Sequence, residues 1–299
     1  MANIKKSILS SLLKKFVMAI TGFVLASFLL IHMLGNLQVL EGGPHAINAY
    51  AHTLQSLPWE ILWGFRIVLA GCFVLHFLMA YLLVLENNKA RPQQYSVKKS
   101  LVAGTASRTM IYTGTLVIAF AVFHILHYTV RNLDPEFTML KWVADSGIYE
   151  GKTLPDVYAI VMLGFSNVWV SVAYIVSMIV IGVHLSHGVS SMFQSVGIRN
   201  EVWRYRLQKI AMAYCIIIAA GFSINPIAVL VSKYTDCEIL PVKCVLKQIE
   251  VQKAAGKDPI FVNYDFTKSC PNKAAACKPC AAATAKPTCP AAPACPAKK

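Results

Sequence analysis

Five long apolar stretches run through this chain and restrict it to a small set of folds. A span of about 20 apolar residues is long enough to cross the ~30 Å hydrocarbon core of a bilayer. The chain is 56% hydrophobic and only 14% charged, a composition that soluble domains do not have. We therefore predict an all-α integral membrane bundle of five transmembrane helices. The helices are expected over residues 16–40, 61–85, 109–130, 165–192 and 207–232.

The distribution of charge predicts how this bundle is oriented. Lysine and arginine gather before the first helix, between the second and third helices, and between the fourth and fifth. The segment 41–60 between the first two helices has neither. This is the positive-inside pattern, which places the N-terminus in the cytoplasm and the C-terminus outside. The same pattern explains the net charge of +14 without nucleic acid. The first helix is too long for a signal peptide and lacks a small-residue cleavage site, so we expect it to be retained.

Four of the five helices carry a histidine at membrane depth, and the four are His32, His76, His124 and His184. An ionisable side chain in this position is costly and usually functional. At ~1.5 Å of rise per residue, the first and third of these lie ~24 Å from the inner boundary. The other two lie ~14 Å from it, about 10 Å lower. The sequence thus predicts an outer pair, His32 with His124, and an inner pair, His76 with His184.

Two stacked pairs of imidazoles favour axial ligation of two buried haems, since two imidazoles fill both axial positions of a haem iron. Proton relay or hydrogen bonding between helices is the alternative use of buried histidine. An internal repeat supports a shared role. Thr21-Gly22 and Thr113-Gly114 each precede an outer histidine, and in both helices the histidine follows ten residues after the glycine.

His127 and His187 leave the assignment open, because each lies three residues after a proposed ligand. Either member of each doublet can face a haem. The repeat with the first helix favours His124, and the depth matched to His76 favours His184.

These residues resemble the dihaem cytochrome b membrane subunit of succinate:quinone oxidoreductases and quinol:fumarate reductases, in its single-subunit, five-helix form. The resemblance covers residues 10–232. It depends on His32 in the series His32-Met33-Leu34-Gly35-Asn36, on His76 and His124, and on His184 with Gly197 thirteen residues later. The segment 48–58 between the first two helices also resembles relatives with this architecture.

The resemblance implies one haem b between the first and third helices and another between the second and fourth. It implies a bacterial cytoplasmic membrane, a cytoplasmic flavoprotein and iron–sulfur subunit as partners, and electron transfer to or from a quinone, usually menaquinone. Oligomers of such a complex are also expected. Some fumarate reductases carry a proton-conducting glutamate two residues before the fourth-helix ligand. Gly182 stands there in this chain, which departs from that pattern.

Further polar residues are weaker candidates for haem-propionate or quinone sites. Arg66 lies near the outer start of the second helix and is a propionate candidate for the outer haem; Arg108 lies at the inner start of the third helix. His52 in the outer loop is a candidate proton acceptor from a quinol. His127 is expected near a quinone, and His187 near an inner propionate or a partner subunit.

Composition changes after residue 232. Residues 233–299 are expected to form an extracytoplasmic segment that is rich in Cys, Lys, Ala and Pro towards its end, with an amphipathic helix over 242–254. Seven of the nine cysteines lie here, and an outer location favours disulfides over free thiols.

Two other functions compete with the succinate/fumarate reading. One is a dihaem cytochrome b of another oxidoreductase, such as a hydrogenase or formate dehydrogenase. The other is a proton-coupled transporter, which would need acidic side chains and broken helices near the middle of the membrane.

Overall fold

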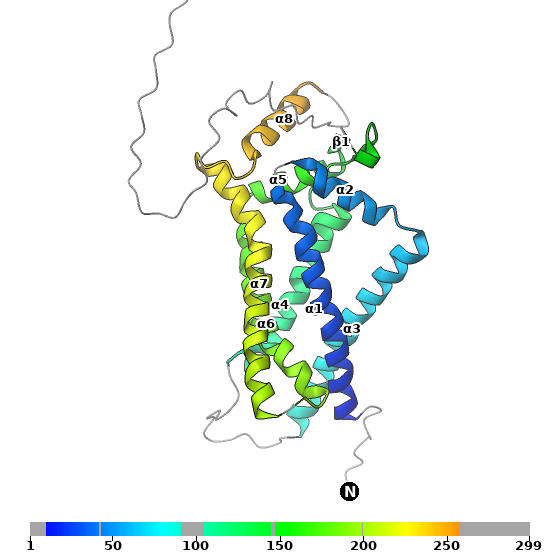
Figure 1. Cartoon of the computed structure of the whole chain (residues 1–299), viewed down its shortest axis with the longest axis vertical. Helices are drawn as coiled ribbons and strands as arrows, with labels where there is room; N and C mark the ends of the chain where they lie inside the picture. Colours follow the sequence, from blue (N-terminus) through cyan, green and yellow to red (C-terminus); the bar gives the residue numbers. More distant parts are fainter. Residues whose placement is uncertain (1–9, 42, 91–104, 145–146, 199, 257–299) are drawn as a thin grey trace, which may run out of the picture.

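The computed structural model describes residues 10–41, 43–90, 105–144, 147–198 and 200–256. Five long helices run between its two ends (Figure 1). The end predicted to face the cytoplasm is called the inner end, and the opposite one the outer end. They are α1 (Ser11–Leu37), α3 (Trp59–Lys89), α4 (Thr105–His124), α6 (Val168–Ser195) and α7 (Glu201–Tyr234). Each is long and apolar enough to cross a membrane, with the last turns of the third span formed by a π-helix, η2 (Ile125–Val130). The mostly helical fold with five helices long and apolar enough to span a membrane is confirmed, and enclosure of two haems stays a prediction.

Three of the long helices, α1, α6 and α7, start at polar residues that cap their first backbone amides. The side chains of Ser10, Asn167 and Asn200 accept hydrogen bonds from the amides of Leu13, Trp169 and Trp203, which is the usual role of such residues before a helix. α1 also starts earlier than expected. Lys14 is buried in this first turn and forms an ion pair with Glu86 of α3. A lysine near the membrane boundary can therefore lie within the helix when a neighbouring helix supplies a carboxylate to pair with it.

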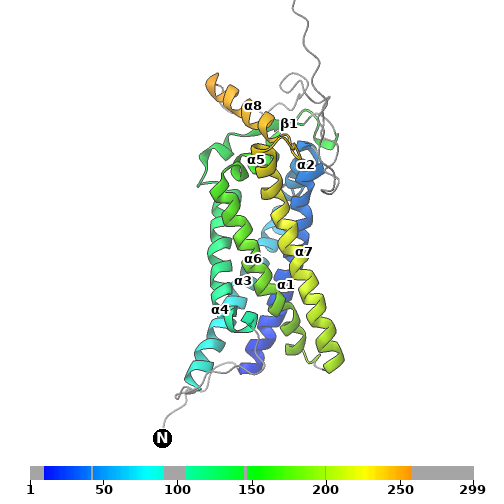
Figure 2. The same ribbon diagram turned by 90° about the vertical axis from the view of Figure 1, so that its left-hand side faces the viewer.

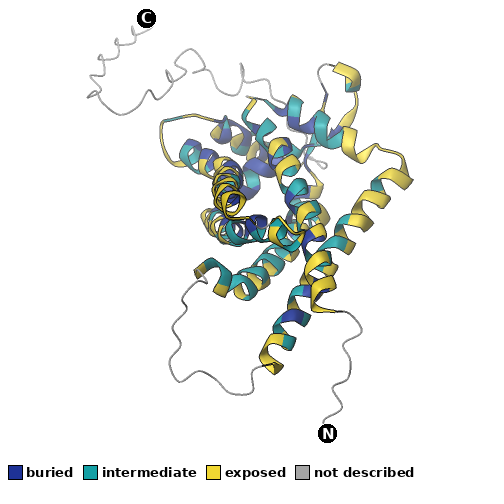
Figure 3. Cartoon of the chain, turned by 60° about the horizontal axis from the view of Figure 1, so that its bottom comes forward, coloured by how far each residue is buried: buried dark blue, intermediate teal, exposed yellow. Residues whose placement is uncertain are grey.

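Packing is uneven around the bundle. α1 packs against α3, α6 and α7, and α6 packs against α4 and α7 (Figure 2). α3 leans away from the other helices towards its outer end (Figure 1). Its surface is largely exposed (Figure 3), with Met79 and Leu83 as its buried residues. An apolar exposed face of this kind is suited to lipid.

A cap of short elements covers the outer end of the bundle (Figure 1). It contains the helices η1 (Gln38–Glu41), α2 (Pro44–Gln55), η3 (Pro135–Thr138), η4 (Gly147–Tyr149), α5 (Val157–Ser166) and α8 (Val242–Ala254). It also contains an antiparallel pair of strands, β1 (Lys141–Val143) and β2 (Thr153–Pro155), with Trp142 opposite Leu154. The all-α prediction missed this hairpin, because three-residue strands depend on contacts that local sequence does not encode.

Helix α8 has the predicted bounds but belongs to the cap. Its side chains Val245 and Ile249 are buried in one core with Tyr158 of α5 and Phe137 of η3. Helix α8 therefore packs on the cap, and the expected domain boundary at residue 232 stays a prediction. The rest of the Cys-rich segment, 257–299, lies outside the described residues.

Candidate cofactor site

The four membrane histidines lie as two pairs, and the pairs are the predicted ones. The ring of His32 on α1 faces that of His124 at the end of α4, with 5.9 Å between ring centres. The ring of His76 on α3 faces that of His184 on α6, with 6.4 Å between ring centres. All four side chains are only partly buried. Imidazoles from four helices thus form two facing pairs.

These separations suit one metal ion between each pair. A metal–imidazole bond of about 2.0 Å, plus about 1.1 Å from the nitrogen to the ring centre on each side, places two opposed ring centres about 6.2 Å apart. The observed 5.9 and 6.4 Å bracket that distance. The ring planes cross at 79° and 66°. The described residues contain no group of three or more His, Cys, Asp or Glu that could hold a metal ion. A macrocycle, which supplies four equatorial nitrogens itself, needs only the two imidazoles.

Helix α1 fixes the orientation of His76. The Nδ1 atom of His76 lies 3.0 Å from the carbonyl oxygen of Met18 and 3.3 Å from Oγ1 of Thr21. A carbonyl only accepts, so Nδ1 carries the proton. The Thr21 hydroxyl already donates to the carbonyl of Val17 at 2.8 Å, so its oxygen can accept as well. Nε2 of His76 is therefore left with a free lone pair.

Helix α4 holds His184 in a similar way. Its Nδ1 lies 3.1 Å from Oγ1 of Thr113, whose hydroxyl donates to the carbonyl of Thr109 at 3.1 Å. The next residue in both helices is a glycine, and the space beside it is taken by the same ring. A Cβ on Gly22 would lie 3.0 Å from Cε1 of His76, and one on Gly114 would lie 3.3 Å from Cε1 of His184. The repeated Thr-Gly therefore seats an inner histidine from the neighbouring helix.

The outer pair is held by different groups. Nδ1 of His124 lies 3.3 Å from the hydroxyl of Tyr174. Asn36 donates to the backbone carbonyl of His32 at 2.7 Å, and its amide nitrogen lies 3.4 Å from Nε2 of the same residue. Aromatic rings of Phe28, Phe120 and Phe222 flank the two imidazoles. The outer site is therefore mainly apolar, with one polar contact to each imidazole.

The two levels are further apart than the sequence predicted. Thr21 contacts His76, and His32 follows eleven residues later in the same helix. That is about 16 Å along the axis, against the expected 10 Å. The expectation took helix entry points from the charged residues, whereas α1 starts at Ser11, about 7 Å before the expected start, which places His32 further from the inner end.

Geometry distinguishes the two histidine doublets. His127 is only 2% exposed. Its Nδ1 lies 3.2 Å from the Tyr174 hydroxyl, and its Nε2 lies 3.7 Å from a carboxylate oxygen of Asp134. Both nitrogens of His127 thus face protein groups. His187 is partly buried one turn inward from His184, and it is the His184 ring that meets His76. His124 and His184 are the members positioned to act as ligands.

The three other predicted residues lie apart from the imidazoles in the described part of the chain. Arg66 is exposed on α3, with its guanidinium 5.1 Å from the ring centre of Trp63. Arg108 is exposed in the first turns of α4. His52 lies in the cap, its ring 4.6 Å from that of Tyr149. Arg66 nevertheless lies at the outer level, because it precedes His76 by ten residues, as Tyr174 precedes His184.

Tyr174 is the main site residue that sequence reasoning missed. The ten-residue spacing that relates glycine to histidine in α1 and α4 also relates Tyr174 to His184 in α6. That spacing was the signal by which it could have been found, since it places the hydroxyl at the height of the outer pair.

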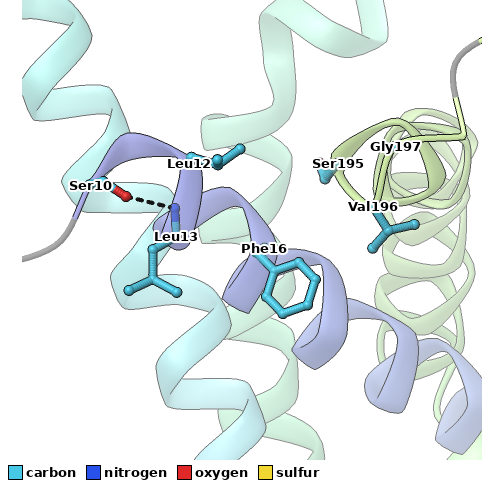
Figure 4. A pocket seen from close by; sticks show the side chains of 7 residues that line it. All are labelled: Ser10, Leu12, Leu13, Phe16, Ser195, Val196 and Gly197. Carbon is cyan, nitrogen blue, oxygen red and sulfur yellow. Dashed lines mark hydrogen bonds between the residues drawn. The ribbon is translucent and has the colours of Figure 1, made fainter.

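The hollows in the surface of the bundle lie elsewhere. One opens at the inner end between the start of α1 and the end of α6 (Figure 4). Leu12, Leu13, Phe16 and Val196 line much of it, and the Ser10 side chain is engaged as the helix cap. None of the four imidazoles lines this hollow. It is an apolar surface without groups that suit acid–base or redox chemistry.

Comparison of the chain with protein-family models, with curated proteins and with solved structures finds no match in any of the three.

Proposed function

We propose that this protein is the membrane anchor and electron-transfer subunit of a succinate dehydrogenase or fumarate reductase, with two haem b groups and a quinone, menaquinone in the first instance, as its substrate. The observation that carries the proposal is the meeting of His32 with His124 and of His76 with His184 at separations that suit an iron between them. A chance arrangement of four membrane histidines would not produce both pairs.

The residues of the chain prepare the imidazoles for this role. A bis-imidazole haem transfers single electrons and offers no open axial position to oxygen or substrate. Thr21, Thr113 and Tyr174 face the Nδ1 atoms of three of the histidines, so their Nε2 atoms would be available to hold an iron. Partners of this kind fix the tautomer and the ring orientation of a histidine ligand. Aromatic side chains make the surroundings of the outer pair largely apolar.

The two ends of the molecule support the proposed partners and orientation. Exposed basic side chains lie at the inner ends of the helices, including Lys15, Lys89, Arg108, Arg204 and Arg206. They provide a cationic surface for cytoplasmic flavoprotein and iron–sulfur subunits. The opposite end carries the cap, in which Cys244 takes part in a disulfide bond. Disulfides persist in oxidising compartments, which supports an outer location for the cap.

Optical spectra and haem analysis of the purified full-length protein test this proposal. We expect a b-type reduced-minus-oxidised difference spectrum and two haems per chain. Solubilised native membranes should yield the chain together with a flavoprotein and an iron–sulfur protein that interconvert succinate and fumarate. Two haems with different partner subunits would instead support a hydrogenase or formate dehydrogenase cytochrome.

A proton-coupled transporter has less support. That reading needs acidic residues and a helix break near the midplane. Among the described residues, α7 continues through Pro226 from Glu201 to Tyr234. Glu86 of α3 lies near the inner end of its helix, where it pairs with Lys14. A chain that binds no haem would reopen this alternative.

A further inference from the structure

A buried polar chain connects the outer imidazole pair with the outer surface. It starts at His124, whose Nδ1 lies 3.3 Å from the Tyr174 hydroxyl. The same hydroxyl lies 3.2 Å from Nδ1 of His127. The other ring nitrogen of His127 lies 3.7 Å from Oδ2 of Asp134, at ion-pair distance. The Asp134 side chain is 49% exposed, so the chain ends at the surface in a carboxylate.

The chemistry of these groups determines which atom donates and which accepts at each step of this series of hydrogen bonds. The carboxylate of Asp134 favours a proton on the nearer nitrogen of His127, which leaves Nδ1 of the neutral ring as an acceptor. Tyr174 then donates its proton to His127, and its oxygen accepts the Nδ1 proton of His124. His124 is thereby held with a free lone pair on Nε2. Each donor has one acceptor, and the last acceptor is the anion.

The protein encloses this chain. His127 is buried against the rings of Phe123, Tyr128 and Phe137. Both histidines reach the one hydroxyl at the point where α4 changes to the π-helix η2. Such π-helical turns are rare and occur often at functional sites. In these surroundings hydrogen bonds are electrostatically stronger than in water.

Among the described residues, the hydrogen-bond partners of the inner pair include no anion. His76 faces a backbone carbonyl and a threonine hydroxyl, and His184 faces a threonine hydroxyl. These partners are neutral. The hydrogen bonds of the outer pair therefore end at an anion, and those of the inner pair end at neutral groups.

We propose that Tyr174, His127 and Asp134 are positioning residues that fix the tautomer of His124 and lower the reduction potential of the outer haem. This inference rests on the proposed function, since it concerns the outer of the two haems. A hydrogen bond that draws on the Nδ1 proton makes an imidazole a more basic ligand, and a more basic ligand favours the oxidised iron. The anionic terminus adds to that effect.

Redox titration of the purified two-haem protein, followed optically, tests the proposal with matched variants. Tyr174→Phe should shift the outer midpoint potential upward and leave the inner one unchanged. Asp134→Asn should shift it in the same direction by less, because the carboxylate is half exposed and screened. Asp134→Glu keeps the charge and should restore most of the original potential. The low-spin ferric signal of the outer haem in electron paramagnetic resonance should change with Tyr174→Phe.

The controls are a tyrosine and a carboxylate that do not belong to this series of hydrogen bonds. Tyr214→Phe removes a hydroxyl that donates to the carbonyl of Ala26. Glu136→Gln removes a surface carboxylate that pairs with Lys253. Both should leave the two potentials unchanged. Unchanged potentials in Tyr174→Phe and Asp134→Asn, or equal shifts at both levels, would overturn the inference and leave the haem proposal intact. A wild-type protein without haem would overturn both.

Discussion

At the scale of single residues, the candidate site depends on which ring nitrogen carries a proton. Nδ1 of His76 faces the Met18 carbonyl, Nδ1 of His184 faces Thr113, and Nδ1 of His124 faces Tyr174. In each case the Nε2 atom is left for another partner. Two facing rings whose Nδ1 atoms have partners and whose Nε2 atoms keep a lone pair, as in His76 and His184, have the arrangement that a metal between them would need.

Replacing Thr113 by valine tests this at the inner level. The substitution keeps the shape of the side chain and removes one hydrogen-bond partner of His184. A net loss of about 0.5–1.5 kcal/mol corresponds to haem retention that is weaker by about 2- to 12-fold. The measurement is the rate at which the inner haem is lost to apomyoglobin from detergent-solubilised protein.

Thr115→Val is the matched control for that substitution. Thr115 lies two residues on in the same helix, is exposed, and donates to its own helix backbone. It should retain both haems as the unmodified protein does. Equal rates for the Thr113 and Thr115 variants would show that the hydroxyl does not hold His184.

At the scale of elements, the cap joins chain segments that are distant in sequence. Asn48 of α2 donates to Asp156 at 3.1 Å and accepts from the amide of Tyr158 at 2.9 Å. Burial, with a further contribution from the nearby Asp156 carboxylate, raises the pKa of Tyr158, so its phenol stays neutral at physiological pH. Helix α8 then closes this core from the C-terminal side. The cap thus fixes the outer ends of α1, α6 and α7.

Truncation of a buried side chain in α8 should loosen the cap. Ile249 is 2% exposed in this core, and Val251 on the same helix is 59% exposed. Ile249→Ala should lower the free energy of unfolding by about 2–5 kcal/mol. Val251→Ala should change it by no more than about 0.5 kcal/mol.

Thermal unfolding in detergent, with limited proteolysis after α7 as a second readout, measures both changes. Equal stability of the two variants would mean that α8 is not packed on the cap, which would support the predicted boundary at residue 232.

How far the sequence predicts these elements depends on their length. The five spans and the pairing of histidines follow from hydrophobicity and from counting residues along helices. The cap does not, because Asn48 and Asp156 are 108 residues apart. Tyr174 could have been found from its ten-residue spacing to His184. Asp134 could not, because the irregular segment that follows η2 returns it to His127. His124 and His127 could not be separated by sequence, since the π-helix that brings both to one hydroxyl has no evident sequence signal.

At the scale of the whole molecule, the two ends differ in chemistry. One end carries exposed lysines and arginines on the inner turns of the helices, and the other carries the mixed charges of the cap. The positive-inside rule assigns the first end to the cytoplasm. Electrons from cytoplasmic partners would then reach the inner pair first and the outer pair second.

Labelling of introduced cysteines tests this orientation. Ile148 in the cap is 82% exposed, and Arg204 is exposed at the opposite end. In intact cells a membrane-impermeant maleimide should modify Ile148→Cys, and it should modify Arg204→Cys only after lysis. Mass spectrometry of the peptides separates these sites from the native cysteines. Modification of the Arg204 variant in intact cells would reverse the topology and remove the case for cytoplasmic partners.

The central claim is that four histidines hold two haems in the pairs seen here, and haem content in single and double variants tests it most directly. His32→Ala and His124→Ala should each lose the same outer haem, and the double variant should lose no more. His76→Ala and His184→Ala should lose the inner haem in the same way, while His187→Ala keeps both. Retention of two haems with unchanged spectra in any of the four single variants, or losses that follow another pairing, would contradict the account.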